Sequence, residues 1–567
     1  MQNTSTIWKT RQTAVALATA IMLAACGGGS DGGAPKTQAL LAGVTTQQLQ
    51  ASAYVDVVQK IYIAYFGRPA DSGGLASFTA QLAQIGAPAD IAGLEQAYYS
   101  TASVRSLVDS FSASAESATL YPGDTKAFVT AVYDHLLNRV PDAEGLAYWV
   151  DAIDHRGLSK SLASLSITVG ALANTTDQGK KDAALISLKS AVANSFTTAL
   201  EGAQGAYVGD NVAALARTML ASLMSSSTQA DFQPVLDAVT ADLKAGTQSA
   251  KPYPLLLSYM SFLSRGQALQ SAVVSGTCSG YSNGNTTIPA QVTFEGKPAL
   301  AATAINTIRL TNCNPPSLKS TTVQYFNANF TPVGSEDPGY EYSVFTTAAQ
   351  PLPVRVAVGD SGSYGVQTVY ANSTKQSVTG RRELSYTIEA DAATTANQPS
   401  AIFNLKVASY DAGNALAFTR QSRYRIAVDG SVTPVSEDEQ YSGASTVHLL
   451  SKAQPTALKI TDSVIGTGAV AANGKTLTAH YTLWLYDASA AGARGTLVES
   501  SVGKTPFSFR LGTGQVIAGF EQGFAGMKAG GKRTLIIPSA LGYGNTSSGP
   551  IAGGAGLVFD VELVSVN

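Results

Sequence analysis

Charged side chains are scarce in this sequence, and their scarcity limits the partners that the chain can bind. Only 13% of its 567 residues are charged, and 37 lysines and arginines against 39 acidic residues leave a net charge of −2. No strongly basic surface is therefore available to neutralise phosphates, and we expect no nucleic acid among its partners. At about 150 residues per domain, the length predicts three or four domains rather than one core.

Cysteine is also scarce, which excludes a dense disulfide scaffold. The three cysteines are Cys26, Cys278 and Cys313, and no two of them have the C-x-x-C spacing of a redox or metal site. We therefore predict no metal. Cys278 and Cys313 form an even pair that we expect to oxidise to a disulfide in an exported chain. In the chain-entropy model, such a bridge raises the free energy of unfolding by roughly 3–4 kcal/mol.

The N-terminal apolar run is too short to span a bilayer. Lys9 and Arg11 precede TAVALATAIMLAA, which has the charge and length of a signal-peptide core. The run ends in Leu23-Ala24-Ala25-Cys26, which resembles the lipobox of bacterial lipoproteins. The resemblance implies removal of a signal peptide over residues 1–25, acylation of Cys26 and a membrane anchor in the cell envelope. Residues 26–50 then form a flexible tether, and the glycine after Cys26 implies the outer membrane.

Residues 51–250 are predicted to form an all-α domain. They are rich in Ala, Leu, Ser and Val at helical spacing, and they contain an internal repeat. Six residues recur with identical spacing: Tyr62, Arg68, Asp71, Gly74, Leu75 and Phe78, then Tyr133, Arg139, Asp142, Gly145, Leu146 and Trp149. Each aspartate is expected to cap the following helix. The motif resembles a bacterial domain of unknown function related to phycobilisome linker repeats, which implies a fold and no particular activity.

The composition changes near residues 249–254, and residues 255–450 are predicted to form a β-rich domain. Short alternating runs rich in Thr, Ser, Asn and Tyr follow that boundary. Two motifs match hydrolase signatures, GYSNG around Ser282 and GDSG around Ser361. No helix pattern follows the first, and the second has no upstream histidine within the same domain. We interpret both motifs as glycine turns.

A glycine-rich stretch, GTGQVIAGFEQGFAGMKAGGKR at residues 512–533, has the composition of a phosphate-binding loop. The dinucleotide fingerprint that starts at Gly512 fails at Ile517, and Arg533 stands where a P-loop needs serine or threonine. We therefore predict neither a nucleotide nor a cofactor. The glycines are interpreted as turn residues around one short helix. Its predicted apolar face consists of Val516, Ile517, Phe520 and Phe524.

Half-buried antiparallel strands are predicted on both sides of this helix. TLTAHYTLWLYD and GLVFDVELVSV alternate apolar and polar residues. With PFSFRLGTGQVIAGFEQGFAGMKAGGKRTLIIP and ALGYG between them, residues 456–567 closely resemble an FKBP-type peptidyl-prolyl cis-trans isomerase. The resemblance implies an α+β domain, in which an antiparallel sheet wraps around one short helix. The chain as a whole is thus predicted to be multidomain, with an all-α repeat domain, a β-rich domain and this α+β domain in order.

The FKBP resemblance implies an aromatic pocket that binds proline-containing polypeptides. Catalytic roles fall on Tyr481, Glu499, Ile517, Tyr543 and Phe559. Substrate-binding roles fall on Val498, Phe507, Val516, Phe520 and Ile551. In the family a tryptophan forms the pocket floor where this chain has Phe520. The resemblance further implies that the Tyr543 hydroxyl and the Ile517 N–H each hold a substrate carbonyl.

Three departures from the family pattern concern the walls of this pocket. Val498-Glu499 replaces Phe-Asp, which removes an aromatic wall and lengthens the acid, Ile551-Ala552-Gly553 replaces Ile-Pro-Pro, and the late loop is one residue shorter. We expect an isomerase that acts on exported proteins with weakened catalysis. Two alternatives remain open, namely an FKBP-fold holdase or partner-binding module, and a surface interaction protein that uses its helical and β domains.

Overall fold

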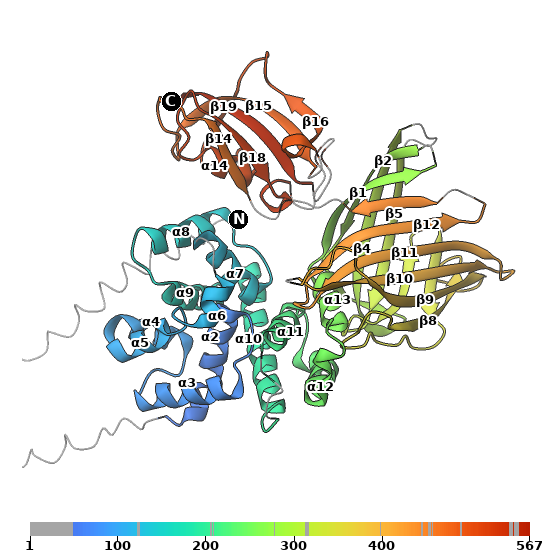
Figure 1. The fold of residues 1–567 in the computed structure, drawn as a ribbon, viewed down its shortest axis with the longest axis horizontal. Helices are drawn as coiled ribbons and strands as arrows, with labels where there is room; N and C mark the ends of the chain where they lie inside the picture. The colour runs from blue at the N-terminus through green and yellow to red at the C-terminus, as the bar shows by residue number, and fades with distance from the viewer. Residues whose placement is uncertain are drawn as a thin grey trace, which may run out of the picture. The chain divides into compact units, whose positions relative to one another are not determined.

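The computed structural model describes residues 49–567 except for 122–124, 204–206, 208, 277, 312–316, 397, 444–445, 452–454, 456–457, 488–489, 544–547, 549–550 and 552–554. The predicted signal peptide, Cys26, nearly all of the tether, and Cys313 therefore lie outside the described residues. The chain is multidomain and divides into two compact units, Met1–Tyr207 and Val208–Asn567 (Figure 1). Among the described residues, no helix has the length and apolar character needed to cross a bilayer.

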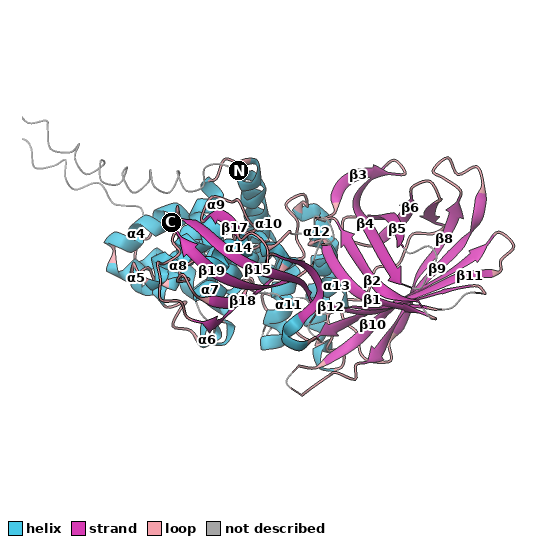
Figure 2. Ribbon diagram, turned by 90° about the horizontal axis from the view of Figure 1, so that it is seen from above, coloured by secondary structure: helices cyan, strands magenta, loops and turns pink. Residues whose placement is uncertain are grey.

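The first unit is helical throughout its described part, as the sequence predicts (Figure 2). Its elements are η1 (Ala51–Tyr54), α2 (Val55–Phe66), α3 (Ser72–Gln84), α4 (Ile91–Ser100), α5 (Ala102–Asp109), α6 (Ala115–Leu120), α7 (Thr125–Leu137), α8 (Ala143–Asp154), α9 (Lys160–Ala173) and α10 (Asp177–Ala199). Nine of the twelve residues of α2 are buried, so this helix lies at the centre of the unit. A helix that is apolar on most of its circumference needs such surroundings.

The repeated aspartates cap their helices as predicted. The Asp71 carboxylate accepts a hydrogen bond from the Gly74 N–H at 2.7 Å, and Asp142 accepts one from Gly145 at the same distance. Each bond satisfies one of the free N–H groups in the first turn of α3 or α8. The two copies of the repeat therefore begin their helices α3 and α8 with the same N-cap hydrogen bond.

The repeated arginines pair with acids from distant helices. Arg68 donates to both carboxylate oxygens of Glu116 in α6, at 2.8 and 2.6 Å. Arg139 donates to Asp182 in α10 at 3.3 and 2.6 Å. A planar guanidinium suits such two-point contacts. The sequence does not identify either acid, because both partners lie more than 40 residues away in the chain.

The second unit begins with further helices, which corrects two predicted boundaries. These elements are α11 (Asp210–Ala221), α12 (Gln229–Ala245), η2 (Thr247–Ser249) and α13 (Leu255–Ser264). The helical run thus extends into the segment predicted to be β-rich, and α11 and α12 belong to the unit that contains the strands. The pattern misleads at α13 because LLLSYMSFLS is apolar on all sides, and a short apolar run of this kind fits a buried strand or a buried helix equally well.

Within the described residues, thirteen strands form one antiparallel sheet after α13. They are β1 (Gln267–Ser275), β2 (Cys278–Thr286), β3 (Ala290–Phe294), β4 (Lys297–Thr311), β5 (Ser317–Phe326), β6 (Pro332–Asp337), β7 (Glu341–Phe345), β8 (Ser361–Tyr370), β9 (Val378–Ala390), β10 (Ser400–Asp411), β11 (Leu416–Ala427), β12 (Val432–Tyr441) and β13 (Val447–Ser451). Pairing of β2 with β4 closes the sheet into a barrel-like ring of twelve strands, and β3 pairs with the start of β4. Closure leaves few exposed strand edges.

Neither serine motif of this region forms a nucleophile elbow. Ser282 is buried in the middle of β2, opposite Ser271 of β1, so the interpretation of GYSNG as a turn is wrong. Glycine is required at position 280, because a Cβ there would lie 1.9 Å from the backbone carbonyl oxygen of Arg309 in β4. GDSG is a turn, as predicted, since Gly359 has a φ of +96° and Ser361 begins β8.

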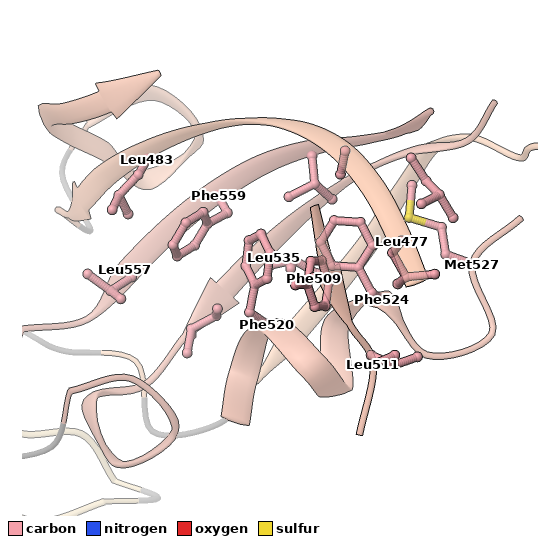
Figure 3. Packing of buried hydrophobic residues seen from close by; sticks show 14 of the residues in the cluster. Leu477, Leu483, Phe509, Leu511, Phe520, Phe524, Met527, Leu535, Leu557 and Phe559 are labelled. Atoms are coloured by element: carbon pink, nitrogen blue, oxygen red, sulfur yellow. The ribbon is translucent and has the colours of Figure 1, made fainter. Parts of the chain in front are cut away.

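The C-terminal domain is a six-stranded antiparallel sheet with one short helix. Its elements are β14 (Lys459–Val464), β15 (Thr476–Tyr486), η3 (Ala491–Ala493), β16 (Arg494–Ser500), β17 (Phe507–Arg510), α14 (Ala518–Phe524), β18 (Lys532–Ile537), η4 (Ser539–Leu541) and β19 (Leu557–Val566). The strand order is β14-β18-β19-β15-β16, and β17 also pairs with β15. Phe520 and Phe524 of α14 point into the core beneath the sheet (Figure 3). The helix begins at Ala518, so Val516 and Ile517 precede it instead of belonging to its face.

Two glycines of α14 allow the helix to pack against the sheet. A Cβ at Gly519 would lie 2.3 Å from the Ile537 side chain, and one at Gly523 would lie 2.4 Å from Leu535. Gly512 and Gly514, in contrast, have positive φ angles and form the turn before the helix. The glycine-rich stretch therefore builds a turn and a close contact between a helix and a sheet.

Candidate functional site

Tyr481 lies at the centre of the candidate site, on β15 where that strand pairs with β16 and β19. Its N–H donates to the Ser501 hydroxyl at 2.9 Å, and its carbonyl accepts from the Ser501 N–H at 2.9 Å. Ser501 is buried and lies just beyond the end of β16. These two bonds hold the backbone of Tyr481 while its side chain stays half-buried at the edge of the core.

Three aromatic rings from three different elements form a cup. Tyr481 meets Phe520 of α14 with ring centroids 6.1 Å apart and Phe559 of β19 at 5.9 Å. Phe520 and Phe559 lie closer, at 4.9 Å (Figure 3). The ring planes cross at 57–86°, the edge-to-face arrangement that aromatic pairs prefer. The fold therefore brings together three of the predicted site residues, Tyr481, Phe520 and Phe559.

The rim of the cup consists of more exposed side chains. Phe507 of β17 packs against Tyr481 with centroids 6.0 Å apart and remains 38% exposed, while Tyr543 is 37% exposed. Exposed aromatic rings beside a buried aromatic floor create an apolar surface that a ligand can reach.

The remaining predicted residues divide between core and surface. Ile551 is buried in the same core cluster, and Val498, Val516 and Ile517 pack against that cluster while partly exposed. Ile517 is the N-cap of α14, and its carbonyl accepts from the Phe520 N–H at 2.9 Å. Ala552 and Gly553, which complete the third departure from the family pattern, lie outside the described residues.

Glu499 is exposed on β16, and it nevertheless affects the pKa of Tyr481, which forms part of the cup. Burial raises the pKa of the Tyr481 hydroxyl, and the charge of Glu499 together with a hydrogen bond to it raises that pKa further. The hydroxyl therefore stays protonated and donates to the carboxylate. The longer acid that stands in place of the family aspartate thus interacts with Tyr481 in this chain.

Two residues of the site were missed by sequence reasoning. Phe509 lies beneath the cup, with centroids 5.7 Å from Phe507 and 5.5 Å from Phe520, and it is buried. The alternation in PFSFR contains the signal, because residues two apart on a strand share a face. Ser501 gave no such signal, since its role depends on a hydrogen bond across two strands.

Among the described residues, no group of three histidine, cysteine, aspartate or glutamate side chains is placed to hold a metal ion. The cup offers apolar rings, one phenol at its rim and one phenol bonded to a carboxylate. Such a site can bind an apolar group and orient its polar neighbours.

Comparison with known proteins identifies this domain. Residues 468–564 match the family of FKBP-type peptidyl-prolyl cis-trans isomerases. The FK506-binding protein of Neisseria meningitidis serogroup B is 46% identical over 111 residues, which are 19% of this chain and 95% of that protein. The chain belongs to the FKBP-type peptidyl-prolyl cis-trans isomerase family. This membership rests on its C-terminal domain, which supports isomerase function at the level of that domain.

Other FKBP relatives also match only a small part of this chain. Peptidyl-prolyl cis-trans isomerase FKBP2 of Mus musculus is 50% identical over 95 residues, which are 16% of this chain and 63% of that protein. The crystal structure of AtFKBP13 has 32% identity, covers 20% of this chain and 98% of its own, and gives a TM-score of 0.18. Residues 108–167 match DUF4214, a domain of unknown function.

Proposed function

We propose that the FKBP domain catalyses cis-trans isomerisation of X-Pro bonds in exported polypeptides. The cup formed by Tyr481, Phe520 and Phe559 is the observation that carries this proposal. It lies within the segment that matches the isomerase family, and the partly exposed rings of Phe507 and Tyr543 add apolar surface within the same domain.

The chemistry requires no nucleophile. Isomerisation passes over a barrier of about 18–20 kcal/mol, because rotation breaks the amide resonance. The twisted amide is less dipolar than the planar one, so an apolar cup favours the twisted form relative to water. Preferential binding of the transition state then accelerates the reaction.

Polar groups at the rim orient the substrate. Tyr543 is 37% exposed, and in the proposed complex its hydroxyl donates to one substrate carbonyl while the Ile517 N–H at the start of α14 donates to another. Glu499 holds the Tyr481 hydroxyl and thereby fixes the wall of the cup. Loss of the aromatic wall at Val498 weakens catalysis in this account, because less apolar surface surrounds the proline.

Variants distinguish the isomerase from a holdase. We expect Tyr543→Phe and Phe559→Leu to slow isomerisation of a prolyl peptide by the full chain, with Tyr486→Phe on the same sheet as the matched control. Suppression of client aggregation is measured in parallel. If isomerisation is unchanged in both site variants, the cup is not the site of catalysis. If the unmodified chain suppresses aggregation without accelerating isomerisation, and the two variants still suppress it, the holdase alternative is favoured.

We further propose that a lipid on Cys26 anchors the chain to the outer membrane. The lipobox-like sequence before Cys26 supports this proposal. Cys26→Ser is expected to release the chain from the membrane fraction, and mass spectrometry of the N-terminal peptide is expected to show acylation. An unmodified N-terminus would contradict the proposal. Protease added to whole cells then reports whether the helical domain faces outwards, as the surface-interaction alternative requires.

A disulfide between Cys278 and Cys313 is part of the same proposal. Cys278 begins β2, and its neighbour Ser279 pairs with Thr311 at the end of β4. The register thus brings the chain on either side of the two cysteines together, which supports the pairing. Peptide mapping without reductant is expected to recover the linked peptides, and separate thiol peptides from an exported preparation would contradict it.

A further inference from the structure

The ring of the second unit has an inner face that the proposed isomerase does not use. Along β11 the side chains alternate, so that Phe418, Arg420 and Tyr424 share one face. Tyr424 pairs with Phe403 of β10, which is fully buried, and this pairing identifies the face as the interior of the ring. Arg420 therefore points into the ring, at a position where most barrel-like sheets of this size keep apolar residues or space for a ligand.

Helix α13 closes one end of this interior. Tyr259 lies 5.3 Å from Phe403 and 5.9 Å from Tyr424 between ring centroids, and Phe262 lies 5.4 Å from Tyr424. Figures 1 and 2 both place α13 at the same end of the ring as α12. The contacts form an aromatic floor, and burial raises the pKa of Tyr259 to about 12.

The walls above this floor are charged, and two of their inward side chains stay partly exposed. Arg420 keeps 35% of its side chain exposed and its neighbour Glu437 keeps 31%, although both point inwards. Glu439 pairs with Arg420 across β11 and β12 and shares the inner face. Further round the ring, Arg382 of β9 forms an ion pair with Glu341 of β7.

The charged walls lie close enough to act on one another across the interior. Burial raises the pKa of Asp337 in β6, and Arg420 of β11 opposes that rise even though four strands separate the two in the ring. Burial and the charge of Glu437 raise the pKa of Glu439, again opposed by Arg420. Two arginines thus face four carboxylates around one space, and the carboxylates are in excess.

Two buried atoms in this space lack a hydrogen-bond partner within the described part of the chain. They are Asp337 Oδ1 and Arg420 Nε, and the Arg420 Nε atom lies 4.0 Å from Glu437 Oε2, as an ion pair beyond hydrogen-bond distance. Buried polar atoms are seldom left unpaired in folded proteins, so the Asp337 Oδ1 acceptor, beside excess negative charge, is free to accept from a donor that the described chain does not supply. Phe418 and Tyr441, whose ring centroids are 4.7 Å apart, add aromatic surface beside Glu439.

We propose that the interior of the ring binds a small organic cation with an apolar body. Its charged group lies between Asp337, Glu437 and Glu439, and its apolar part lies towards the aromatic floor made by Tyr259 and Tyr424. Excess carboxylates attract the cation, aromatic faces favour it further, and the floor buries the apolar part.

Three probes of one shape test the proposal on the full chain. 4-Phenylbutylamine is cationic, 4-phenylbutanol is neutral and 4-phenylbutyrate is anionic, and calorimetry gives the affinity of each. An FKBP-directed macrolide saturates the isomerase pocket throughout, so that the phenyl group does not bind there. We expect the amine to bind about tenfold more tightly than the alcohol, and the anion more weakly than both. Affinities within threefold of one another, or tightest binding of the anion, would overturn the proposed cation site. Neither result would bear on the proposed isomerase function, because the macrolide occupies that pocket.

Isosteric variants locate the bound cation. Asp337→Asn and Glu439→Gln are each expected to weaken amine binding about fivefold and to leave alcohol binding unchanged. Asp438→Asn is the matched control, because Asp438 lies between Glu437 and Glu439 on β12 but bonds to Arg423 and His448 on the other face of the sheet. Equal weakening by the control would place the cation outside the ring. The comparison of the three probes needs no variant and holds even if one of the variants fails to fold.

Discussion

Phe520 and Phe559 meet with their ring centroids 4.9 Å apart and their planes at 64°, although one lies on a helix and the other on the last strand. Both are at most 5% exposed, yet the neighbouring Tyr481 is only partly buried. The floor of the proposed proline pocket is therefore also part of the core. Mutations at this point are expected to affect stability and catalysis together.

Truncation of the pocket floor tests this double role. We expect Phe520→Ala to lower the free energy of unfolding by about 3–5 kcal/mol, because it leaves a cavity in a packed core. Phe507→Ala removes the same ring from the rim, where the side chain is 38% exposed, and is expected to cost far less. Urea unfolding of the C-terminal domain measures both, and equal losses would show that Phe520 does not belong to the core.

The close contact of α14 with the sheet gives a second prediction. Gly519→Ala places a methyl group 2.3 Å from Ile537 and is expected to destabilise the domain by about 1–3 kcal/mol. Gly73→Ala in α3 is the matched control, since its Cβ would meet only the Asp71 side chain at 3.5 Å. Alanine favours a helix over glycine, so the control is expected to stabilise by about 0.5–1 kcal/mol. Thermal unfolding distinguishes these opposite signs, and stabilisation by both would refute the close contact.

A buried carboxylate in the ring makes stability depend on pH. Hydrogen bonds from Arg425 lower the pKa of Asp391 to about 2, opposed by burial and aided by Ser400. Because the pKa is lower in the folded state, this stabilisation is present above about pH 4 and is lost as the pH falls through about 2. Asp391→Asn is therefore expected to cost about 2 kcal/mol at pH 7 and little at pH 2.

Denaturant titrations of this variant at several pH values measure the dependence. The control is Asp237→Asn in α12, where the carboxylate is exposed. A difference between Asp391→Asn and the unmodified chain that stays constant from pH 7 to pH 2 would contradict the assigned role of the Arg425 contact.

The repeated arginines give a fourth prediction. Arg68 forms two hydrogen bonds with Glu116 and a third with the Pro69 carbonyl at 2.9 Å. Arg68→Lys keeps the charge but loses the planar fork, so we expect a loss of about 1–3 kcal/mol in the stability of the helical unit. Arg156→Lys, at a side chain that is 46% exposed, is expected to change it by less than about 0.5 kcal/mol. Helical circular dichroism during urea unfolding measures both variants.

The sequence predicts local features of this protein well, because they depend on neighbouring residues. The caps at Asp71 and Asp142 and the alternation along β15 follow from short patterns that the structure confirms. Closure of the ring does not follow from such patterns, because the pairing of β2 with β4 is a matter of register. The acid partner of Arg68 and the cross-strand bond of Ser501 are equally non-local. Helix α13 lies inside the range predicted to be β-rich, because a short apolar run without a polar face fits a buried helix or a buried strand.

The candidate site shows the same division. Family motifs brought Tyr481, Phe520 and Phe559 to one place, whereas Phe509 was overlooked and Val516 was assigned to a helix that begins two residues later. The charged interior of the ring could not be predicted at all. Its residues come from β6, β11 and β12, and only closure of the sheet brings them together.

The measurement that tests the central claim most directly is the cis-to-trans rate of a short X-Pro peptide in the presence of the full chain. We predict acceleration over the uncatalysed reaction, which takes tens of seconds or longer, and loss of that acceleration when an FKBP-directed macrolide is added. A rate equal to the uncatalysed one, from protein shown to be folded, would contradict the isomerase and leave the cup as a binding site.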